Sequence, residues 1–220
     1  MEWQPLWLSL QVSAVATAIA LGLGIFGGAL LSRPNFPGRD LLDALLTAPM
    51  VLPPTVLGYF LLVCLGRNSA VGQAFEAAVG HPIVFSFTGA VVAATIGALP
   101  LIVKAARAAF EQVDPTLVQA ARTLGATPAR AFLKIQLPLA GRGIAAGTVL
   151  GFARALGDFG ATLMVAGNIP HQTRTASLAI YDAIEAGRDA DAAGMIAVLT
   201  ALAIAVGYGA QQLVKRPDAL

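Results

Sequence analysis

The chain has 220 residues, of which 57% are hydrophobic and only 12% are charged. Soluble domains carry about 25% charged residues, so this chain has too little charge to cover a water-facing surface, and lipid must cover much of its outside. The formal net charge is +2 and the basic residues are dispersed among loops, which argues against a nucleic-acid partner. A single cysteine, Cys64, excludes a disulfide or a thiolate metal site within one chain, and we expect no cofactor.

Five apolar segments are long enough to cross a membrane, since about 20 apolar residues span the hydrocarbon core. We therefore predict an all-α membrane protein, a bundle of about five transmembrane helices in a single domain over residues 1–220. No Lys or Arg precedes the first segment, which favours a retained span over a signal peptide. A break of the second segment at Pro49, Pro53 and Pro54 would leave room for a sixth span. The predicted spans are residues 6–32, 45–65, 85–103, 143–166 and 192–214.

The basic residues predict the orientation, because cytoplasmic loops of membrane proteins are enriched in Lys and Arg. Ten lie in the loops and ends on one side of the bundle, three lie on the other side, and Arg154 falls inside a span. We expect the N-terminus outside and the C-terminus in the cytoplasm. The ten are Arg33, Arg39, Lys104, Arg107, Arg122, Arg130, Lys134, Arg142, Lys215 and Arg216, and the three are Arg67, Arg174 and Arg188.

A predicted cytoplasmic loop, residues 111–140, contains two short helices. Asp114 can cap a helix that starts at Pro115 and ends near Leu124, and Gly125 can supply a left-handed residue at its end. Thr127 and Pro128 repeat the cap and the start. We expect this second helix to run to about Leu137, and Pro138 to prevent its simple continuation.

The second helix of the loop has two different faces. Arg130 and Lys134 lie four residues apart on one face, while Ala131, Phe132 and Ile135 form an apolar strip. Such a segment lies at a membrane surface, either as an amphipathic helix without a partner or as a docking site.

The loop resembles the cytoplasmic loop of the membrane subunits of bacterial ABC importers. That loop has the form E-A-A, three residues, G, nine residues, I, one residue, L-P, and every spacing agrees here, with Gln119 in place of the glutamate. The resemblance implies a fold like that of type I ABC importer permeases and a coupling helix that docks in a cleft of an ATP-hydrolysing subunit. The residues that it assigns to coupling are Gln119, Ala120, Ala121, Gly125, Arg130, Phe132, Lys134, Ile135, Leu137 and Pro138.

Two opposite charges lie within the fourth predicted span, where charges are costly. Arg154 and Asp158 are four residues apart and can neutralise each other on one helix face. The pair is either a structural lock between helices, a gate that faces a transport pathway, or, with the arginine, a contact for the substrate. Because a paired arginine has little field left for an anion, we favour the lock or gate.

Four sequence stretches resemble the molybdate permease group of these importers. They are residues 53–59 (PPTVLGY), 155–161 (ALGDFGA), 168–175 with its NIP and TRT elements, and 179–181 (AIY). Sulfate and thiosulfate permeases share the second stretch, usually with glutamate at position 158, so sulfate or thiosulfate is the alternative to molybdate or tungstate. The resemblance implies a homodimer with two ABC ATPase subunits and an extracytoplasmic molybdate-binding protein.

An anion pathway needs polar walls that attract the ion only weakly, because strong binding would trap it. Hydroxyl side chains within the spans are candidates, although each is more often bonded to its own backbone. The candidates are Thr55, Tyr59, Thr95, Thr148 and Thr162.

Other functional classes fit less well. The chain has no G-x-x-x-x-G-K-[ST] phosphate loop, so we expect no ATPase site and no enzyme activity of its own. An intramembrane enzyme needs His, Ser or paired acids within the spans, yet His81 and His171 fall in predicted outer loops. An ion-driven carrier usually has intramembrane acids and two inverted halves, and neither is visible.

Overall fold

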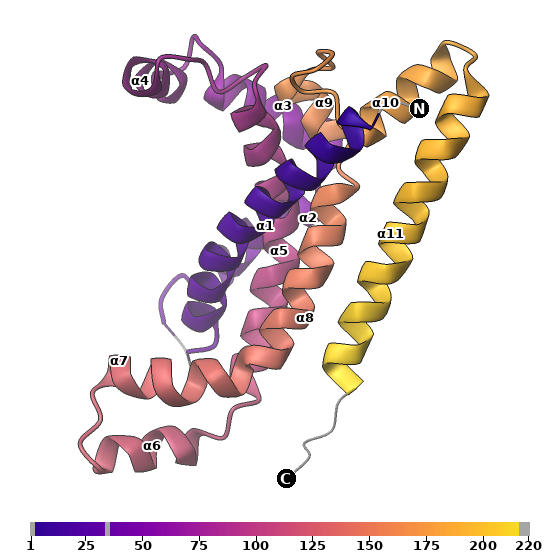
Figure 1. Cartoon of the computed structure of the whole chain (residues 1–220). Coiled ribbons are helices and arrows are strands. Elements are labelled where there is room, and N and C mark those ends of the chain that lie inside the picture. Colours follow the sequence, from indigo (N-terminus) through magenta and orange to yellow (C-terminus); the bar gives the residue numbers. More distant parts are fainter. Residues whose placement is uncertain (1–2, 34–35, 216–220) are drawn as a thin grey trace.

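The computed structural model describes residues 3–33 and 36–215, with side chains up to Gln212, and within these ranges it contains helices but no strand (Figure 1). The elements in chain order are α1 (Gln4–Leu31), α2 (Arg39–Val51), α3 (Pro54–Leu65), α4 (Ala70–Val79), α5 (Phe87–Glu111), α6 (Pro115–Thr123), α7 (Pro128–Ala131), a π-helical turn (Phe132–Gln136), α8 (Leu137–Leu156), α9 (Gly160–Ala166), α10 (Ala176–Glu185) and α11 (Asp189–Lys215).

Helix α5 is the centre of the bundle, and α1 and α8 pack against it through small residues. A Cβ added at Gly28 of α1 would lie 2.6 Å from the Cβ of Ala106, and one added at Gly143 of α8 would lie 2.7 Å from the Cβ of Ala109. Helices in lipid associate through such close approach, because hydrophobic exclusion does not operate between them. The small residues that recur every four positions in α1 and α8 therefore serve packing within the chain.

Among the described residues, three helices are long and apolar enough to cross a membrane by themselves: α1, α5 and residues 189–212 of α11. Two bent pairs reach that length only together, α2 with α3 and the helical stretch 128–156 with α9, and the count rises to five when each pair is one span. The predicted bundle of about five apolar helices is therefore confirmed, but two of its members are bent.

The second predicted span, residues 45–65, falls on a pair of helices rather than on one straight helix. The chain bends by 115° between α2 and α3. Leu52 and Pro53 between them have ψ values of 140° and 135°, which are extended conformations. The residue before a proline disfavours the helical region, so the Pro53–Pro54 pair stops α2, and Pro54 then starts α3. Pro49 stays inside α2.

The fourth predicted span, residues 143–166, is also bent. Helix α8 ends at Leu156, and α9 starts at Gly160 at an angle of 61° to the helical stretch before it. The third span is a single helix that runs eight residues beyond its predicted end at Val103, to Glu111. The predicted fifth span lies inside α11.

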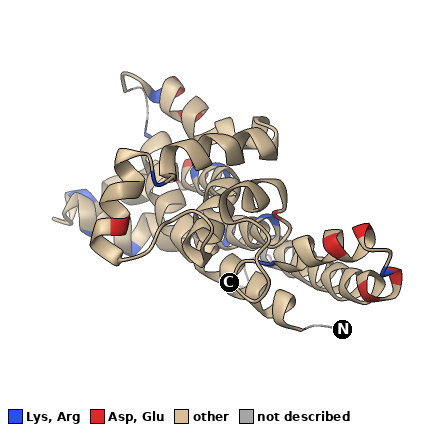
Figure 2. Ribbon diagram, turned by 90° about the horizontal axis from the view of Figure 1, so that it is seen from above, with Lys and Arg blue, Asp and Glu red and all other residues tan. Residues whose placement is uncertain are grey.

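The two ends of the bundle differ in charge. The end that carries α6 and α7, here called the loop end, also holds the end of α1, the start of α2 and the end of α11 (Figure 1). The basic residues that we grouped together lie at this end, except that Arg216 and the side chain of Lys215 lie outside the described parts. Seen along the bundle, most of the ribbon carries no charge and acidic residues gather where α10 meets α11 (Figure 2).

Large apolar side chains cover the outside of the helices. Their exposure includes 72% for Phe26 of α1, 84% for Val51 of α2 and 68% for Ile204 of α11. A soluble monomer rarely exposes apolar area on this scale, so the surface fits a lipid environment or contacts with other subunits. Helix α11 packs against α8 and α10.

Candidate functional site

The two loop helices begin and end as their local sequence predicts. The carboxylate of Asp114 accepts a hydrogen bond from the Thr116 N–H at 2.8 Å, and this bond holds the pKa of the Asp114 carboxyl below its ordinary value. Gly125 has φ +87°, and the Ala126 N–H closes the turn by donating to the Ala121 carbonyl. The hydroxyl of Thr127 accepts from the Arg130 N–H at 3.3 Å.

The loop presents an exposed face and a face packed on the bundle. Gln119, Ala120, Gly125, Arg130, Lys134 and Pro138 are exposed, whereas Ala121, Phe132, Ile135 and Leu137 are half-buried. The ring of Phe132 lies 5.6 Å from that of Phe110, the second-last residue of α5, and Ala131 is buried beside it. Phe132 thus holds the loop against the membrane helices within this structure.

The return from the loop to the membrane is continuous, contrary to the expected interruption at Pro138. Before the proline the helix widens into a π-helical turn, in which the Leu137 N–H donates to the Phe132 carbonyl. Pro138 has no N–H, and its ring would crowd the carbonyl four residues earlier in an α-helix. The wider turn relieves that conflict, and α8 continues from it.

The break between α8 and α9 is built around Asp158. Its side chain is 1% exposed, and its oxygens accept from Arg154 Nη1 at 2.9 Å, the Thr162 N–H at 2.9 Å and the Thr162 hydroxyl at 2.7 Å. The carboxylate of Asp158 therefore accepts the hydrogen bond of a free N–H in the first turn of α9 and pairs with Arg154 one turn earlier. The side chain of Arg154 is 32% exposed, and its guanidinium lies beside Gly97 of α5.

The hydroxyl candidates for a pathway occupy different environments. Thr55 and Tyr59 are exposed on α3. Thr95 is buried and donates to the Val91 carbonyl at 2.7 Å, and Thr162 is buried on Asp158, so neither faces an open path in this structure. Thr148 donates to the Ile144 carbonyl and faces the space between α1, α8 and α11. Thr55, Tyr59 and the half-buried Thr148 thus face open space in this structure, and the pathway role of all five residues stays a prediction.

Helices α3 and α9 touch closely across their two breaks. A Cβ added at Gly58 would lie 2.7 Å from the Met164 Cβ and 3.0 Å from the Ala161 Cα, and one added at Gly160 would lie 3.0 Å from the Pro54 Cβ. Only glycine permits these backbones to approach so far. The start of α3 therefore sits on the start of α9, next to the Arg154–Asp158 pair.

A groove of about 800 Å³ runs between α5 and α8 from the loop end. Its mouth is lined by Gln112, Asp114 and Pro138, and its far end reaches Gly147 and Leu150. Arg154 lies one helical turn beyond Leu150.

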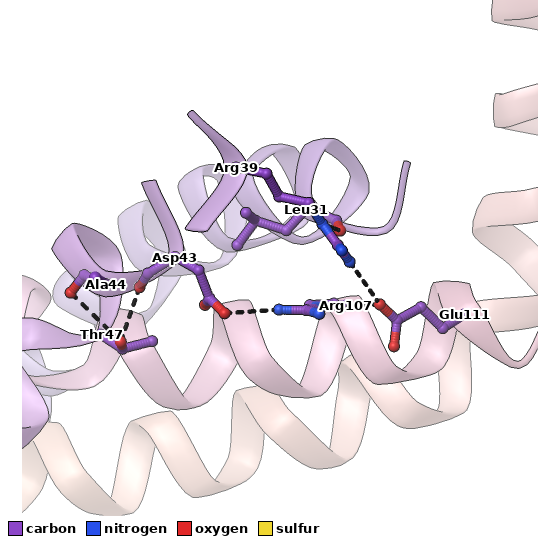
Figure 3. Close-up of polar contacts among 7 residues, drawn as sticks. All are labelled: Leu31, Arg39, Asp43, Ala44, Thr47, Arg107 and Glu111. Carbon is purple, nitrogen blue, oxygen red and sulfur yellow. Dashed lines mark hydrogen bonds and ion pairs between the residues drawn. The ribbon is translucent and has the colours of Figure 1, made fainter. Parts of the chain in front are cut away.

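A cluster of ion pairs at the loop end was not predicted as a site (Figure 3). Arg107 of α5 donates from Nη1 to Asp43 of α2 at 2.7 Å and from Nε to Glu111 at 2.8 Å. Arg39 of α2 donates from Nε to the Leu31 carbonyl at 3.0 Å and reaches Glu111 at 3.4 Å. The sequence shows opposite charges four residues apart at positions 39 and 43 and at positions 107 and 111. These spacings predict contacts within each helix, but they could not predict that α2 pairs with α5.

The Asn168 and Arg174 positions of the molybdate-permease resemblance have a structural role at the opposite end. Arg174 donates to Asn168 at 3.0 Å and pairs with Asp182 at 2.9 Å, and Asn168 donates to Asp182 at 2.9 Å. The three side chains hold the loop between α9 and α10.

A family model for the inner-membrane components of binding-protein-dependent transport systems matches residues 20–216. The chain belongs to this family. Its membership accounts for the apolar bundle and for the loop with the E-A-A-like sequence, and it makes the chain a membrane-embedded transport subunit of an ABC importer.

Several curated family members are similar over most of their length. The molybdenum transport system permease protein ModB of Escherichia coli K12 is 48% identical, covering 92% of this chain and 89% of the relative. The putative molybdenum transport permease YvgM of Bacillus subtilis 168 is 39% identical, covering 94% and 92%. The sulfate transport permease CysT of Salmonella typhimurium LT2 is 34% identical, covering 82% and 70%.

Solved members of this fold class agree with the architecture. A chain of the MetNI methionine ABC transporter in an inward-facing conformation superposes with a TM-score of 0.73 at 19% identity, covering 96% of this chain and 93% of that one. A chain of a bacterial alginate ABC transporter complex gives 0.73 at 14% identity, covering 97% and 78%. These likenesses confirm the predicted fold of a type I ABC importer permease.

Proposed function

We propose that the chain is the permease subunit through which an ABC importer carries molybdate or tungstate into the cytoplasm. The observation that carries the proposal is the 48% identity with a molybdenum permease over 92% of the chain. Sulfate or thiosulfate is the second candidate, because the sulfate permease is 34% identical. These oxyanions are tetrahedral dianions, so a pathway with weakly polar walls suits all of them and selection falls to the binding protein.

ATP hydrolysis in a partner subunit drives the transport, and the loop α6–α7 is where that partner docks. The exposed face of the loop supports this role, because Gln119, Ala120 and Gly125 are small or uncharged and open to a partner. Arg130 and Lys134 flank this face and can pair with acidic groups of the ATPase. Gln119 cannot form the salt bridge that a glutamate would form at this position.

The working unit contains two copies of this chain, two ATPase subunits and an extracytoplasmic oxyanion-binding protein. The exposed apolar faces of α2, α3 and α8 support contact with a second copy, and the α5–α8 groove that opens at the loop end supports an exit for the ion on that side. The loop end faces the cytoplasm and the N-terminus lies outside, as the basic residues at the loop end favour. The Arg154–Asp158 pair beyond the groove acts as lock or gate.

Uptake by proteoliposomes tests the transported ion. The permease is reconstituted with its ATPase, and the binding protein is supplied outside with radiolabelled molybdate. We expect uptake that requires ATP, that tungstate inhibits strongly and that sulfate inhibits weakly. Preferential uptake of sulfate would support the second candidate, and ATP-independent uptake or no uptake of any oxyanion would contradict the proposal.

Fusion of a reporter after Arg39 tests the orientation. We expect a cytoplasmic reporter to be active there and an exported reporter to be inactive. The opposite result would reverse the proposed topology.

A further inference from the structure

Helix α2 is held to the bundle in an unusual way for an apolar protein. None of its residues is buried, although 9 of the 13 in Arg39–Val51 are apolar. Its ion pairs with α5 lie in its first two turns, where Arg39 and Asp43 face Arg107 and Glu111 (Figure 3). The rest of the helix packs only through half-buried residues, among them Leu46 beside Gly27, so this ion cluster supplies the polar contacts that fix where α2 begins.

Arg107 is the central member of the cluster. Its guanidinium reaches two carboxylates on two helices at once, Asp43 at 2.7 Å and Glu111 at 2.8 Å. A planar guanidinium fixes the direction of both bonds, which a lysine ammonium does not. The second oxygen of Asp43, Oδ1, is buried and has no hydrogen-bond partner in the described part of the chain, so this carboxylate depends on Arg107.

The cluster lies directly before the coupling loop. Glu111 is the last residue of α5, and Asp114, three residues later, caps α6. The ring of Phe110, next to Glu111, also contacts the ring of Phe132 at the other end of the loop. A displacement of the loop therefore acts first on the last turn of α5, where the cluster sits.

The other end of the α2–α3 arm lies at the break between α8 and α9. The arm bends by 115° at Pro53, and α3 then packs on α9 without intervening side chains at Gly58 and Gly160. Helix α9 begins two residues after Asp158, which is bonded to Arg154 and Thr162. The arm thus contacts the end of α5, next to the coupling loop, and the start of α9, next to the Arg154–Asp158 pair.

We propose that Arg107 is a positioning residue that ties the coupling loop to the α2–α3 arm, so that the arm carries a movement of the loop to the Arg154–Asp158 pair. This inference rests on the proposed function. It assigns to Arg107, Asp43 and Glu111 a role in coupling that the loop residues alone do not cover.

The sharpest test is Asp43→Asn in the complete transporter, with Asp40→Asn as its matched control. Asp40 is an exposed aspartate on the same helix and makes no ion pair within the described residues. We expect Asp43→Asn to lower the oxyanion taken up per ATP hydrolysed by about fivefold, the low end of typical coupling between two sites. Asp40→Asn should keep the wild-type ratio.

A double variant separates coupling from stability. If the pair only stabilised the fold, Asp43→Asn with Arg107→Gln would recover the wild-type ratio, because neither member of the pair keeps a charge without the other and the exposed Glu111 still has Arg39 at 3.4 Å. If the pair transmits movement, the ratio stays low in the double variant while thermal stability recovers. Lys104→Gln on the exposed side of α5 is the control for Arg107→Gln, and if Arg107→Gln fails to assemble, Asp43→Asn and the double variant decide the question.

The native Cys64 gives a readout that does not depend on the transported ion. It is the only cysteine of the chain and lies exposed on α3, in the far part of the arm. We expect its rate of labelling by a maleimide, read from the mass of the permease, to differ between nucleotide-free and ATP-bound transporter in the wild type and in Asp40→Asn, and to differ no longer in Asp43→Asn.

The outcomes distinguish the two proposals. A wild-type uptake ratio and a wild-type labelling response in Asp43→Asn would overturn the role of Arg107, and so would a full recovery of both in the double variant. If the wild-type transporter takes up no oxyanion while Cys64 still responds to ATP and Asp43→Asn abolishes that response, the proposed ion is wrong and the coupling role stands.

Discussion

The ion pair in the fourth span offers a quantitative test of how charges are tolerated in this bundle. Replacing Arg154 with Met removes the cation and leaves the Asp158 carboxylate, which is 1% exposed, with only its two bonds from Thr162. Stranding one member of a buried pair costs about 3–5 kcal/mol, and since the side chain of Arg154 is 32% exposed we expect a value of about 3 kcal/mol.

Adding Asp158→Asn to Arg154→Met should restore part of that loss. The asparagine oxygen can still accept from the Thr162 N–H, so α9 keeps its start while no charge is buried alone. The remaining cost is the lost charge-assisted bond and some packing, about 1 kcal/mol. The double variant should therefore be more stable than Arg154→Met by about 2 kcal/mol, the difference between the two costs.

Reversible unfolding in mixed detergent micelles, followed by circular dichroism, measures these differences. The control is Arg67→Gln, whose partner Glu76 lies 3.2 Å away in an exposed pair, with side chains 64% and 36% accessible, and which should change stability by less than about 1 kcal/mol. If the double variant is no more stable than Arg154→Met, or if Arg154→Met costs no more than the control, the two charges do not stabilise each other.

Three further predictions concern the loop and the packing of the bundle. Gly125→Val should lower uptake per ATP while the chain still inserts, because φ +87° strains a β-branched residue, whereas Gly141→Val, at an open helical position, should not. Gly28→Val should destabilise the chain by about 1–3 kcal/mol, because a Cβ would lie 2.8 Å from the backbone nitrogen of Arg107. A Cβ at Gly22 meets nothing within 4 Å, so Gly22→Val is the control in the same unfolding assay. The pKa of the Asp114 carboxyl is lowered in the folded chain, so its cap stabilises α6 fully above the ordinary carboxyl pKa. This stabilisation is lost as the pH falls through the lowered pKa of the folded chain. Hydrogen exchange of the Thr116 amide should therefore rise with acid, beyond the intrinsic change with pH, in the wild type but not in Asp114→Asn. Equal loss of coupling in Gly125→Val and Gly141→Val, equal stability of the variants at positions 22 and 28, or an acid response that persists in Asp114→Asn would contradict the respective explanation.

Local sequence predicted the candidate loop well because its determinants are local. Asp114, Gly125 and Thr127 act on backbone groups within three residues of themselves, so their roles could be read without a partner element. The i, i+4 spacing likewise predicted that Arg154 meets Asp158. What the same reading missed were contacts between distant elements, such as Arg107 with Asp43, and the burial of Thr95 and Thr162.

The sequence by itself determined that the chain is a bundle of apolar helices, because a backbone in lipid must bond to itself and runs of about 20 apolar residues do so as helices. Only the tertiary structure decided the shape of those helices. Pro53 and Gly157 mark where the helices can break, but the packing of Gly58 on α9 and the bonds of Asp158 select the angles observed. The widened turn before Pro138 was decided in the same way, since Phe132 on Phe110 anchors one side of it and α8 on α5 anchors the other.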